Sequence, residues 1–246
     1  MVDEPVVILC GGRGTRLREE TQTIPKPLVE IGGRPILWHV IRIYADQGFR
    51  RFVLCLGHRG DLVRDFVERD GLPDALAIEC VDTGEETPTG GRVALVRDRL
   101  EGRRFCATYA DGVADIDLSA LLEFHAGHGA LATMTVVRPE LQFGVARLNG
   151  ADVVEGFEEK PRFDGWINGG FFCFEPGVFD YLDQRSVLER EPLERLAADG
   201  QLRAYRHPGF WDCMDTYKDA VLLNDLWAAD RAPWKELHRL RRKPRS

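Results

Sequence analysis

A glycine-rich loop near the start of the chain has the residue types that bind phosphate groups. It contains three glycines within four positions, Gly11, Gly12 and Gly14. Glycines let backbone N–H groups approach anionic oxygens closely, and Arg13 and Arg16 add positive charge to the same loop. The loop lacks the Gly-Lys-Ser/Thr of a Walker A motif and the third glycine of a dinucleotide fingerprint. Taken alone, it is consistent with either phosphate binding or a plain tight turn.

A lysine between two prolines, Pro25-Lys26-Pro27, follows this loop. The prolines restrict the backbone on both sides of Lys26, so its ammonium group points in a defined direction. Such an arrangement favours a charge that meets an anion. The alternative from the sequence alone is a surface lysine in an irregular loop.

Two carboxylates from distant parts of the chain are candidates for a metal site. Asp111 follows the apolar run 105–109, and Asp215 precedes the last helix that we expect, 216–229. Carboxylate oxygens suit Mg²⁺, a hard cation that keeps some of its waters. Asp111-Gly112 is also a common turn, and Asp215-Thr216 could cap the helix. Both interpretations stay open for each aspartate.

The elements that must position these residues alternate between short apolar runs and longer amphipathic ones. We expect strands at 6–10, 51–57, 76–81 and 105–109, with helices from Pro35 toward Gly48, at 61–69 and at 92–100. This alternation is typical of βαβ units over a mainly parallel sheet. The first half therefore predicts a Rossmann-like α/β/α arrangement in three layers.

The second half has a different pattern, in which β-rich runs at 132–137, 145–148, 153–160 and 169–174 are separated by short helices. The last helix is expected to bury Tyr217, Ala220, Val221, Leu223 and Leu226 or their neighbours. We predict a mixed central sheet and a smaller β-rich part, within one domain over 1–237. Residues 1–115 would form a nucleotide-binding half and 116–237 a sugar-binding half, followed by a basic, flexible tail at 238–246.

Composition excludes several classes of protein. The chain of 246 residues is 44% hydrophobic and has a net charge of −7, which argues against a nucleic-acid binder. No apolar run is long enough to span a membrane, and the acidic N-terminus is unlike a secretory signal, so we expect a cytoplasmic protein. The six cysteines lack CxxC spacing, which favours free, mostly buried thiols over disulfides or a zinc site.

The motifs together resemble the signature of the sugar-1-phosphate nucleotidylyltransferases. The strings that carry the resemblance are GGRGTRL at 11–17, PKP at 25–27, IGGRPIL at 31–37, YADG at 109–112, FEEKP at 157–161, NGG at 168–170 and MDT at 214–216. Within that family the likeness is greatest to the glucose-1-phosphate cytidylyltransferases, through VDTG at 81–84, TGGR at 89–92, HPGFW at 207–211 and APWK at 232–235.

The resemblance implies a magnesium-dependent reaction in which the oxygen of a sugar 1-phosphate attacks the α-phosphorus of an NTP and pyrophosphate leaves. It implies that Lys26 and Arg16 are catalytic, and that Asp111 and Asp215 hold Mg²⁺. The substrates that it implies are CTP and glucose 1-phosphate. The nucleotide-binding residues would be Leu9, Gly11, Gly12, Gly14, Thr15, Arg16, Lys26, Thr87, Gly91 and Arg92.

The sugar phosphate would contact Gly144, Glu159, Lys160, Asn168 and Trp211. A surface Glu-Glu-Lys cluster and a buried core tryptophan are the alternatives for Glu159, Lys160 and Trp211. The base would be read by the loop 87–92. Thr87 and Arg92 carry donors that suit the O2 and N3 acceptors of cytosine, although Arg92 could instead point from a helix into water.

Three other functions stay open: the same reaction with dTTP, UTP, GTP or another sugar phosphate, a sensing relative without catalysis, and a metal-dependent glycosyltransferase. The last would need an Asp-x-Asp pair, and the only such string, Asp115-Ile116-Asp117, fits better as the approach to a helix. Because the resembled enzymes assemble, we also expect a homo-oligomer. No nucleic acid or membrane is expected as a partner.

Overall fold

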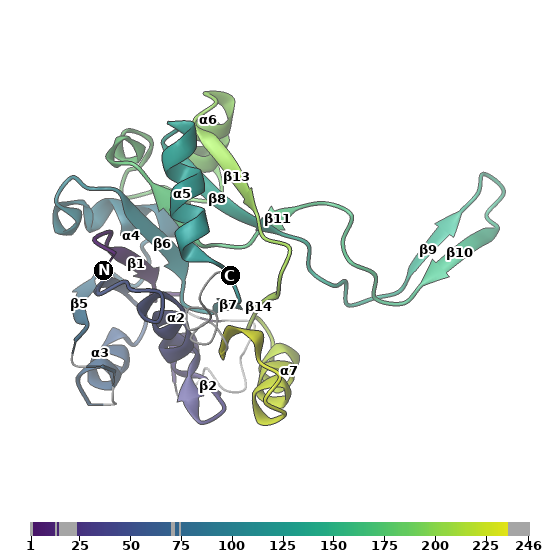
Figure 1. Ribbon diagram of the computed structural model, residues 1–246, viewed down its shortest axis with the longest axis horizontal. Coiled ribbons are helices and arrows are strands. Elements are labelled where there is room, and N and C mark those ends of the chain that lie inside the picture. Colours follow the sequence, from purple (N-terminus) through teal and green to yellow (C-terminus); the bar gives the residue numbers. More distant parts are fainter. Residues whose placement is uncertain (1, 13, 15–23, 70–71, 74, 236–246) are drawn as a thin grey trace, which may run out of the picture.

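The computed structural model describes residues 2–12, 14, 24–69, 72–73 and 75–235. Its centre is an eight-stranded sheet in the order β11-β8-β12-β6-β1-β4-β5, with β13 paired to β8 (Figure 1). The strands of this sheet are β1 (Val6–Leu9), β4 (Arg51–Leu56), β5 (Ala77–Asp82), β6 (Phe105–Tyr109), β8 (Ala132–Val137), β11 (Ile167–Asn168), β12 (Phe172–Phe174) and β13 (Leu202–Arg206).

Parallel and antiparallel pairs are combined in this sheet. Strand β1 is parallel to both β4 and β6, and β4 is parallel to β5. Strand β12 is antiparallel to β6 and β8, β11 is antiparallel to β8, and β13 is parallel to β8. The predicted mixed sheet with a parallel first half is therefore confirmed.

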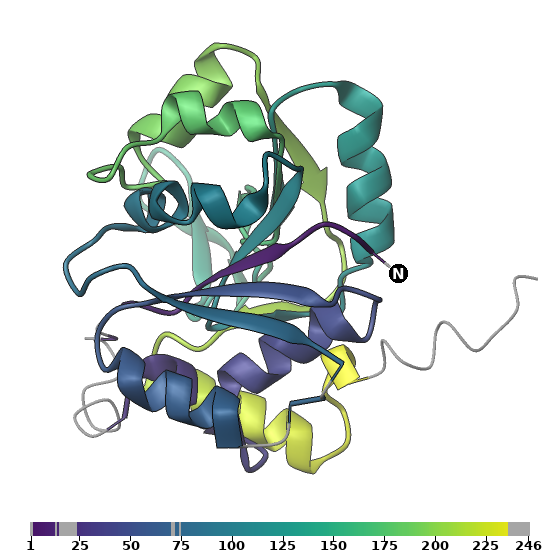
Figure 2. The same ribbon diagram turned by 90° about the vertical axis from the view of Figure 1, so that its left-hand side faces the viewer.

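Helices cover both faces of the sheet (Figure 2). One face packs against α2 (Ile36–Ala45), α3 (Gly60–Arg69), α5 (Leu118–His128) and α7 (Tyr217–Ala228). The other packs against α4 (Thr89–Leu95), η4 (Pro176–Tyr181) and α6 (Glu191–Ala198). Successive residues of β1 alternate between the two cores, Val6 and Ile8 in one, Val7 and Leu9 in the other. This is the three-layer α/β/α arrangement that the sequence predicts.

Short elements complete the described chain. They are the 3₁₀ turns η2 (Lys26–Leu28), η3 (Arg97–Leu100) and η5 (Pro233–Lys235), and the strands β2 (Glu30–Ile31), β3 (Arg34–Pro35), β7 (Gly112–Ala114) and β14 (Trp211–Cys213). A hairpin of β9 (Val145–Leu148) and β10 (Val154–Glu158) extends away from the body on two long connections (Figure 1). We call this hairpin with its connections, residues 139–166, the arm.

Several expected elements differ from the structure. The helix expected at 92–100 begins at Thr89 and gives way to η3, because the poor helix formers Gly90 and Gly91 pack closely against the backbone of Ser186 and Gln184. The strand expected at 169–174 is interrupted, since Gly170 and Phe171 both have positive φ, and β12 begins only at 172.

The burial expected for the last helix is also wrong for two residues. Tyr217 is 56% exposed and Val221 is 41% exposed, whereas Ala220 and Leu223 face the core as expected. The strand expected at 153–160 spans only β10.

The six cysteines are all free, and four of them are buried, as predicted. Within the described ranges, no helix is long and apolar enough to cross a membrane.

Candidate active site

The ends of the parallel strands create a cavity of about 470 Å³. The loops after β1, β4, β5 and β6 leave the same edge of the sheet, because parallel strands all end there. Most of the predicted nucleotide and metal residues line this cavity, namely Leu9, Gly11, Gly12, Gly14, Lys26, Thr87, Arg92, Asp111 and Asp215. Thr15 and Arg16 lie outside the described residues.

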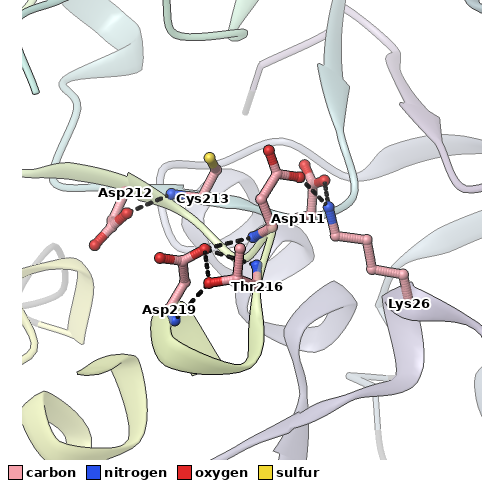
Figure 3. Close-up of polar contacts among 7 residues, drawn as sticks. Lys26, Asp111, Asp212, Cys213, Thr216 and Asp219 are labelled. Atoms are coloured by element: carbon pink, nitrogen blue, oxygen red, sulfur yellow. Dashed lines mark hydrogen bonds and ion pairs between the residues drawn. The ribbon is translucent and has the colours of Figure 1, made fainter. Parts of the chain in front are cut away.

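Lys26 and the two aspartates meet at one point of this cavity. Lys26 Nζ lies 2.6 Å from Asp111 Oδ2 and 2.6 Å from Asp215 Oδ1 (Figure 3). Lys26 comes from η2, directly after Pro25 and before the buried Pro27, so its backbone is restricted as predicted. Three charged groups from distant segments therefore converge where a phosphate and its counterion could bind.

A pair of short strands brings the aspartates together. In the antiparallel pair β7 and β14, Cys213 lies opposite Gly112, and Met214 N–H donates to Asp111 O at 2.9 Å. Asp111 immediately precedes β7 and Asp215 follows β14 by two residues, so the pairing places them side by side. The sequence motifs identified both aspartates without indicating this pairing.

Asp219 holds the turn that carries Asp215. Its carboxylate Oδ2 accepts from Asp215 N at 3.1 Å and from Thr216 N at 2.7 Å, and Thr216 caps α7 in return (Figure 3). Asp215-Thr216 thus combines both interpretations, since Thr216 is the cap while the Asp215 side chain faces Lys26. Asp219 was not expected from the sequence, although Thr216-x-x-Asp219 resembles a capping box.

The charge on Lys26 is stabilised by its neighbours. Burial alone would lower the pKa of Lys26, but the charge of Asp111 and hydrogen bonds to both aspartates outweigh it and raise the pKa. The ammonium group therefore stays protonated over the physiological pH range.

Nearby, burial raises the pKa of Asp212 to about 6, although Cys213 N–H donates to that carboxylate at 2.8 Å.

The residues of the Asp111 and Asp215 pair fit a magnesium ion. Mg²⁺ is held in proteins by one or two carboxylates, with waters and substrate phosphates completing its octahedral shell. In the described part of the chain, no group of three or more His, Cys, Asp or Glu side chains forms a denser metal site. Two carboxylates of this kind could hold a metal ion whose remaining ligands are waters and phosphate oxygens.

Arg92 is buried beneath the glycine loop, and four of its N–H groups are used within the protein. Nη1 donates to Leu56 O at 2.8 Å and to Thr83 Oγ1 at 2.7 Å. Nη2 donates to Gly11 O at 3.0 Å and to Glu85 O at 3.1 Å. The guanidinium group thus ties together the loops that follow β1, β4 and β5.

Two other residues of the predicted base loop, Thr87 and Gly91, also contact neighbouring parts of the protein. Thr87 donates its hydroxyl proton to Thr83 O at 2.5 Å. Gly91 lies behind the wall of the cavity, where a Cβ atom would come within 2.3 Å of Gln184 O. Direct donation to a base from Thr87, or from Nη1 or Nη2 of Arg92, would require exchange of these bonds.

The predicted sugar residues are divided among three places. Lys160 and Trp211 line a second cavity of about 440 Å³ between the base of the arm and α7. Asn168 lies beside the first cavity, where its Nδ2 donates to the hydroxyl of Tyr109 at 3.1 Å. Gly144 and Glu159 are neighbours on the arm, since a Cβ at Gly144 would lie 2.7 Å from Glu159 Oε2.

Trp211 links the two cavities. Its Nε1 donates to Gly169 O at 2.7 Å, next to Asn168, and β14 leads from Trp211 toward Asp215.

Tyr109 and Glu189, which bond to each other across the rim of the first cavity, were not expected from the sequence. They are 80 residues apart, and no motif joins them.

Comparison with known proteins identifies the family of this chain. The profile of the Nucleotidyl transferase family matches residues 5–215. The chain belongs to this family. It is 42% identical to the glucose-1-phosphate cytidylyltransferases of Salmonella typhimurium and Salmonella typhi, over 93% of this chain and 98% of each relative. The family and its nucleotidyltransferase activity are therefore those that the sequence motifs predict.

The fold is shared with solved structures of much lower identity. The crystal structure of HddC from Yersinia pseudotuberculosis matches with a TM-score of 0.73 at 23% identity, and the match covers 91% of this chain and 99% of that one. At this identity the match concerns the fold alone.

Proposed function

We propose that this nucleotidyltransferase transfers a cytidylyl group from CTP to glucose 1-phosphate, giving CDP-glucose and pyrophosphate. The observation that carries the proposal is the convergence of Lys26, Asp111 and Asp215 at the cavity formed by the glycine loop. The 42% identity to relatives named glucose-1-phosphate cytidylyltransferase, over nearly their whole length, supports this choice of substrates.

In the proposed reaction, an oxygen of the sugar phosphate forms a bond to the α-phosphorus of CTP while the bond to the pyrophosphate oxygen breaks. Both reactants are anions, so catalysis consists mainly of holding them in line and neutralising charge. Lys26 would bind near the α-phosphate, and Arg16, outside the described residues, near the leaving pyrophosphate. Backbone N–H groups of Gly11, Gly12 and Gly14 would contact the phosphates.

Mg²⁺ would be held by Asp111 and Asp215. When bound, it supplies positive charge to phosphate oxygens. With the metal present, the two carboxylates would be shared between it and the ammonium group of Lys26, which lies 2.6 Å from each of them.

The sugar phosphate would lie toward Lys160, Trp211 and Asn168. Lys160 and Trp211 already line one cavity, and Trp211 joins it to the segment that carries Asn168. Gly144 and Glu159 would contribute from the arm. We assign base recognition to the loop 87–92, held in shape by Arg92. In this division, 1–115 serves the nucleotide and 116–237 the sugar.

We further propose that the chain works as a homo-oligomer. The hairpin of the arm exposes a set of large apolar side chains, Phe143, Val145, Leu148, Val153, Val154 and Phe157. A two-stranded hairpin is marginally stable alone, and exposed apolar patches of this kind are typical of interfaces. Sedimentation at micromolar concentration should give a species larger than a monomer, and a monomer alone would contradict the proposal.

The substrates are tested by measuring pyrophosphate release with glucose 1-phosphate, Mg²⁺ and each NTP in turn. We expect release with CTP that requires both the sugar phosphate and the metal. Release only with UTP, dTTP, GTP or ATP would keep the reaction and discard the cytidylyl assignment. If no NTP reacts with any sugar phosphate tested, the protein is a sensing relative rather than an enzyme.

A further inference from the structure

The carboxylate of Glu189 joins two walls of the nucleotide cavity. Its Oε2 accepts from the hydroxyl of Thr89 at 2.6 Å, and its Oε1 accepts from the hydroxyl of Tyr109 at 2.5 Å. Thr89 and Tyr109 both line the cavity. Thr89 begins α4 on the side of the base loop, whereas Tyr109 ends β6, two residues before Asp111.

The direction of each hydrogen bond from Asn168 through Tyr109 and Glu189 to Thr89 is determined. Gly170 N–H can only donate, and it donates to Asn168 Oδ1 at 2.8 Å, so Asn168 Nδ2 must be the atom that faces Tyr109, at 3.1 Å. The Tyr109 hydroxyl accepts this bond and uses its single proton on Glu189. The Thr89 hydroxyl likewise accepts from Leu188 N at 2.9 Å and donates to Glu189.

The backbone that precedes Glu189 packs closely against the start of α4. Gly91 N–H donates to Ser186 O at 2.9 Å. A Cβ atom at Gly90 would lie 2.8 Å from Ser186 O, and one at Gly91 would lie 2.3 Å from Gln184 O. The first turn of α4 is therefore seated directly on the segment 184–189, so a change at Glu189 acts on a closely packed support.

We propose that Glu189 is a positioning residue that couples the nucleotide side of the site to the sugar side. The inference rests on the proposed function, in which Asn168 contacts the sugar and the loop 87–92 the base. Through Thr89, Glu189 holds the start of α4, and through Tyr109 it holds the amide of Asn168 in one orientation. The second N–H of that amide is the one that a sugar hydroxyl would accept.

A glutamine at position 189 is the most informative change, because it keeps the shape and removes the acceptor-only character. Its NH₂ group would donate to one of the two hydroxyls, whose own proton must then turn elsewhere. Whichever hydroxyl this is, the residue no longer accepts from both walls, so the connection between the two substrate sides is broken. If that hydroxyl is Tyr109, its proton can turn to Asn168 only when the amide flips and its bond from Gly170 breaks. The donor facing the sugar is lost with that flip.

The test compares steady-state kinetics of wild type, Glu189→Gln, Tyr109→Phe and the double variant, with CTP and glucose 1-phosphate varied separately. Glu191→Gln is the matched control, since Glu191 lies two residues away at the exposed start of α6, where it forms an ion pair with Arg195 at 3.3 Å. We expect Glu189→Gln to raise KM for both substrates by at least about fivefold while its melting temperature stays that of the wild type. The control Glu191→Gln should keep wild-type kinetic constants.

The Tyr109→Phe variant should raise KM for glucose 1-phosphate to a similar extent, and adding Glu189→Gln to it should raise that constant no further, because both act through one hydrogen-bond chain. A rise in KM for CTP alone, additive effects in the double variant, or wild-type constants in Glu189→Gln would each overturn the coupling.

The proposed function is tested separately, by wild-type turnover. If the wild type uses another substrate pair, the ratio of variant to wild type is measured with that pair and still decides the coupling. If the wild type turns over no pair, both proposals fall.

Discussion

Replacing Arg92 with methionine tests whether its guanidinium group holds the cavity together. Arg92 is 4% exposed and makes four hydrogen bonds, to Leu56 O, Thr83 Oγ1, Gly11 O and Glu85 O. Methionine keeps an unbranched apolar stem but lacks the guanidinium group, so it removes all four bonds. The glycine loop, the end of β4 and the start of the base loop would then lose their common partner.

The cost can be worked from these contacts. Two of the acceptors keep another donor, because Leu56 O also accepts from Thr83 N and Gly11 O also accepts from His58 N. We therefore use about 1 kcal/mol for each bond, below the range for charged donors, which gives a loss of roughly 4 kcal/mol. For a domain of this size, that corresponds to a fall in melting temperature of about 8–16 °C.

Thermal unfolding of Arg92→Met and of the control Arg99→Met provides the measurement. Arg99 lies seven residues further along the chain, is exposed and pairs with Glu79 at 3.2 Å, so its replacement should change stability by less than about 1 kcal/mol. Activity should fall by a similar factor with every NTP that the wild type accepts, because the whole cavity is affected. Unchanged stability with a loss confined to CTP would refute this reasoning and make Arg92 a direct reader of the base.

Three further predictions follow from the site and the core. Lys26→Met should lower kcat/KM by at least about tenfold, or 1.4 kcal/mol, because it removes the cation that meets both aspartates; a smaller effect would remove Lys26 from the mechanism. Chelation by EDTA should abolish pyrophosphate release, and added Mg²⁺ should restore it in the wild type but not in Asp215→Asn. Activity that survives EDTA would contradict the metal assignment. Burial lowers the pKa of His39 to about 4, so the free energy of unfolding should fall by up to about 3 kcal/mol between pH 6.5 and 4, where only the unfolded chain gains the proton. The His39→Gln variant should lose this pH dependence. If the stability of the variant fell with pH as steeply as that of the wild type, His39 would not be its cause.

Much of the fold could be predicted because its strands are short, continuous apolar runs. The strands at 105–109, 132–137 and 145–148 occur at the expected residues. The errors arise where tertiary contacts override local preference. The start of α4 has two glycines, which disfavour a helix, yet the segment 184–189 holds them in one. Similarly, positive φ at Gly170 and Phe171 breaks a run that has an unbroken β-like pattern in the sequence.

The candidate site divides in the same way. Residues within a local motif, such as Lys26 between its prolines, could be found from the sequence, and the structure brings Lys26 together with Asp111 and Asp215. Residues that act through distant partners could not. Glu189 meets Tyr109 only because the fold brings together two segments that lie 80 residues apart, and a single glutamate before a helix has no signal of its own. The roles of Gly144 and Glu159 stay predictions that depend on the arm.

The central claim is that this site makes CDP-glucose. The most direct test is a competition in which the enzyme, Mg²⁺ and glucose 1-phosphate are given equal concentrations of CTP, UTP, dTTP, GTP and ATP, and the sugar nucleotides formed are identified by mass spectrometry. Because all nucleotides compete for one site, the product ratio reports the ratio of their kcat/KM values. We expect CDP-glucose to be the dominant product. A different NDP-glucose as the main product, or no sugar nucleotide at all, would contradict the account.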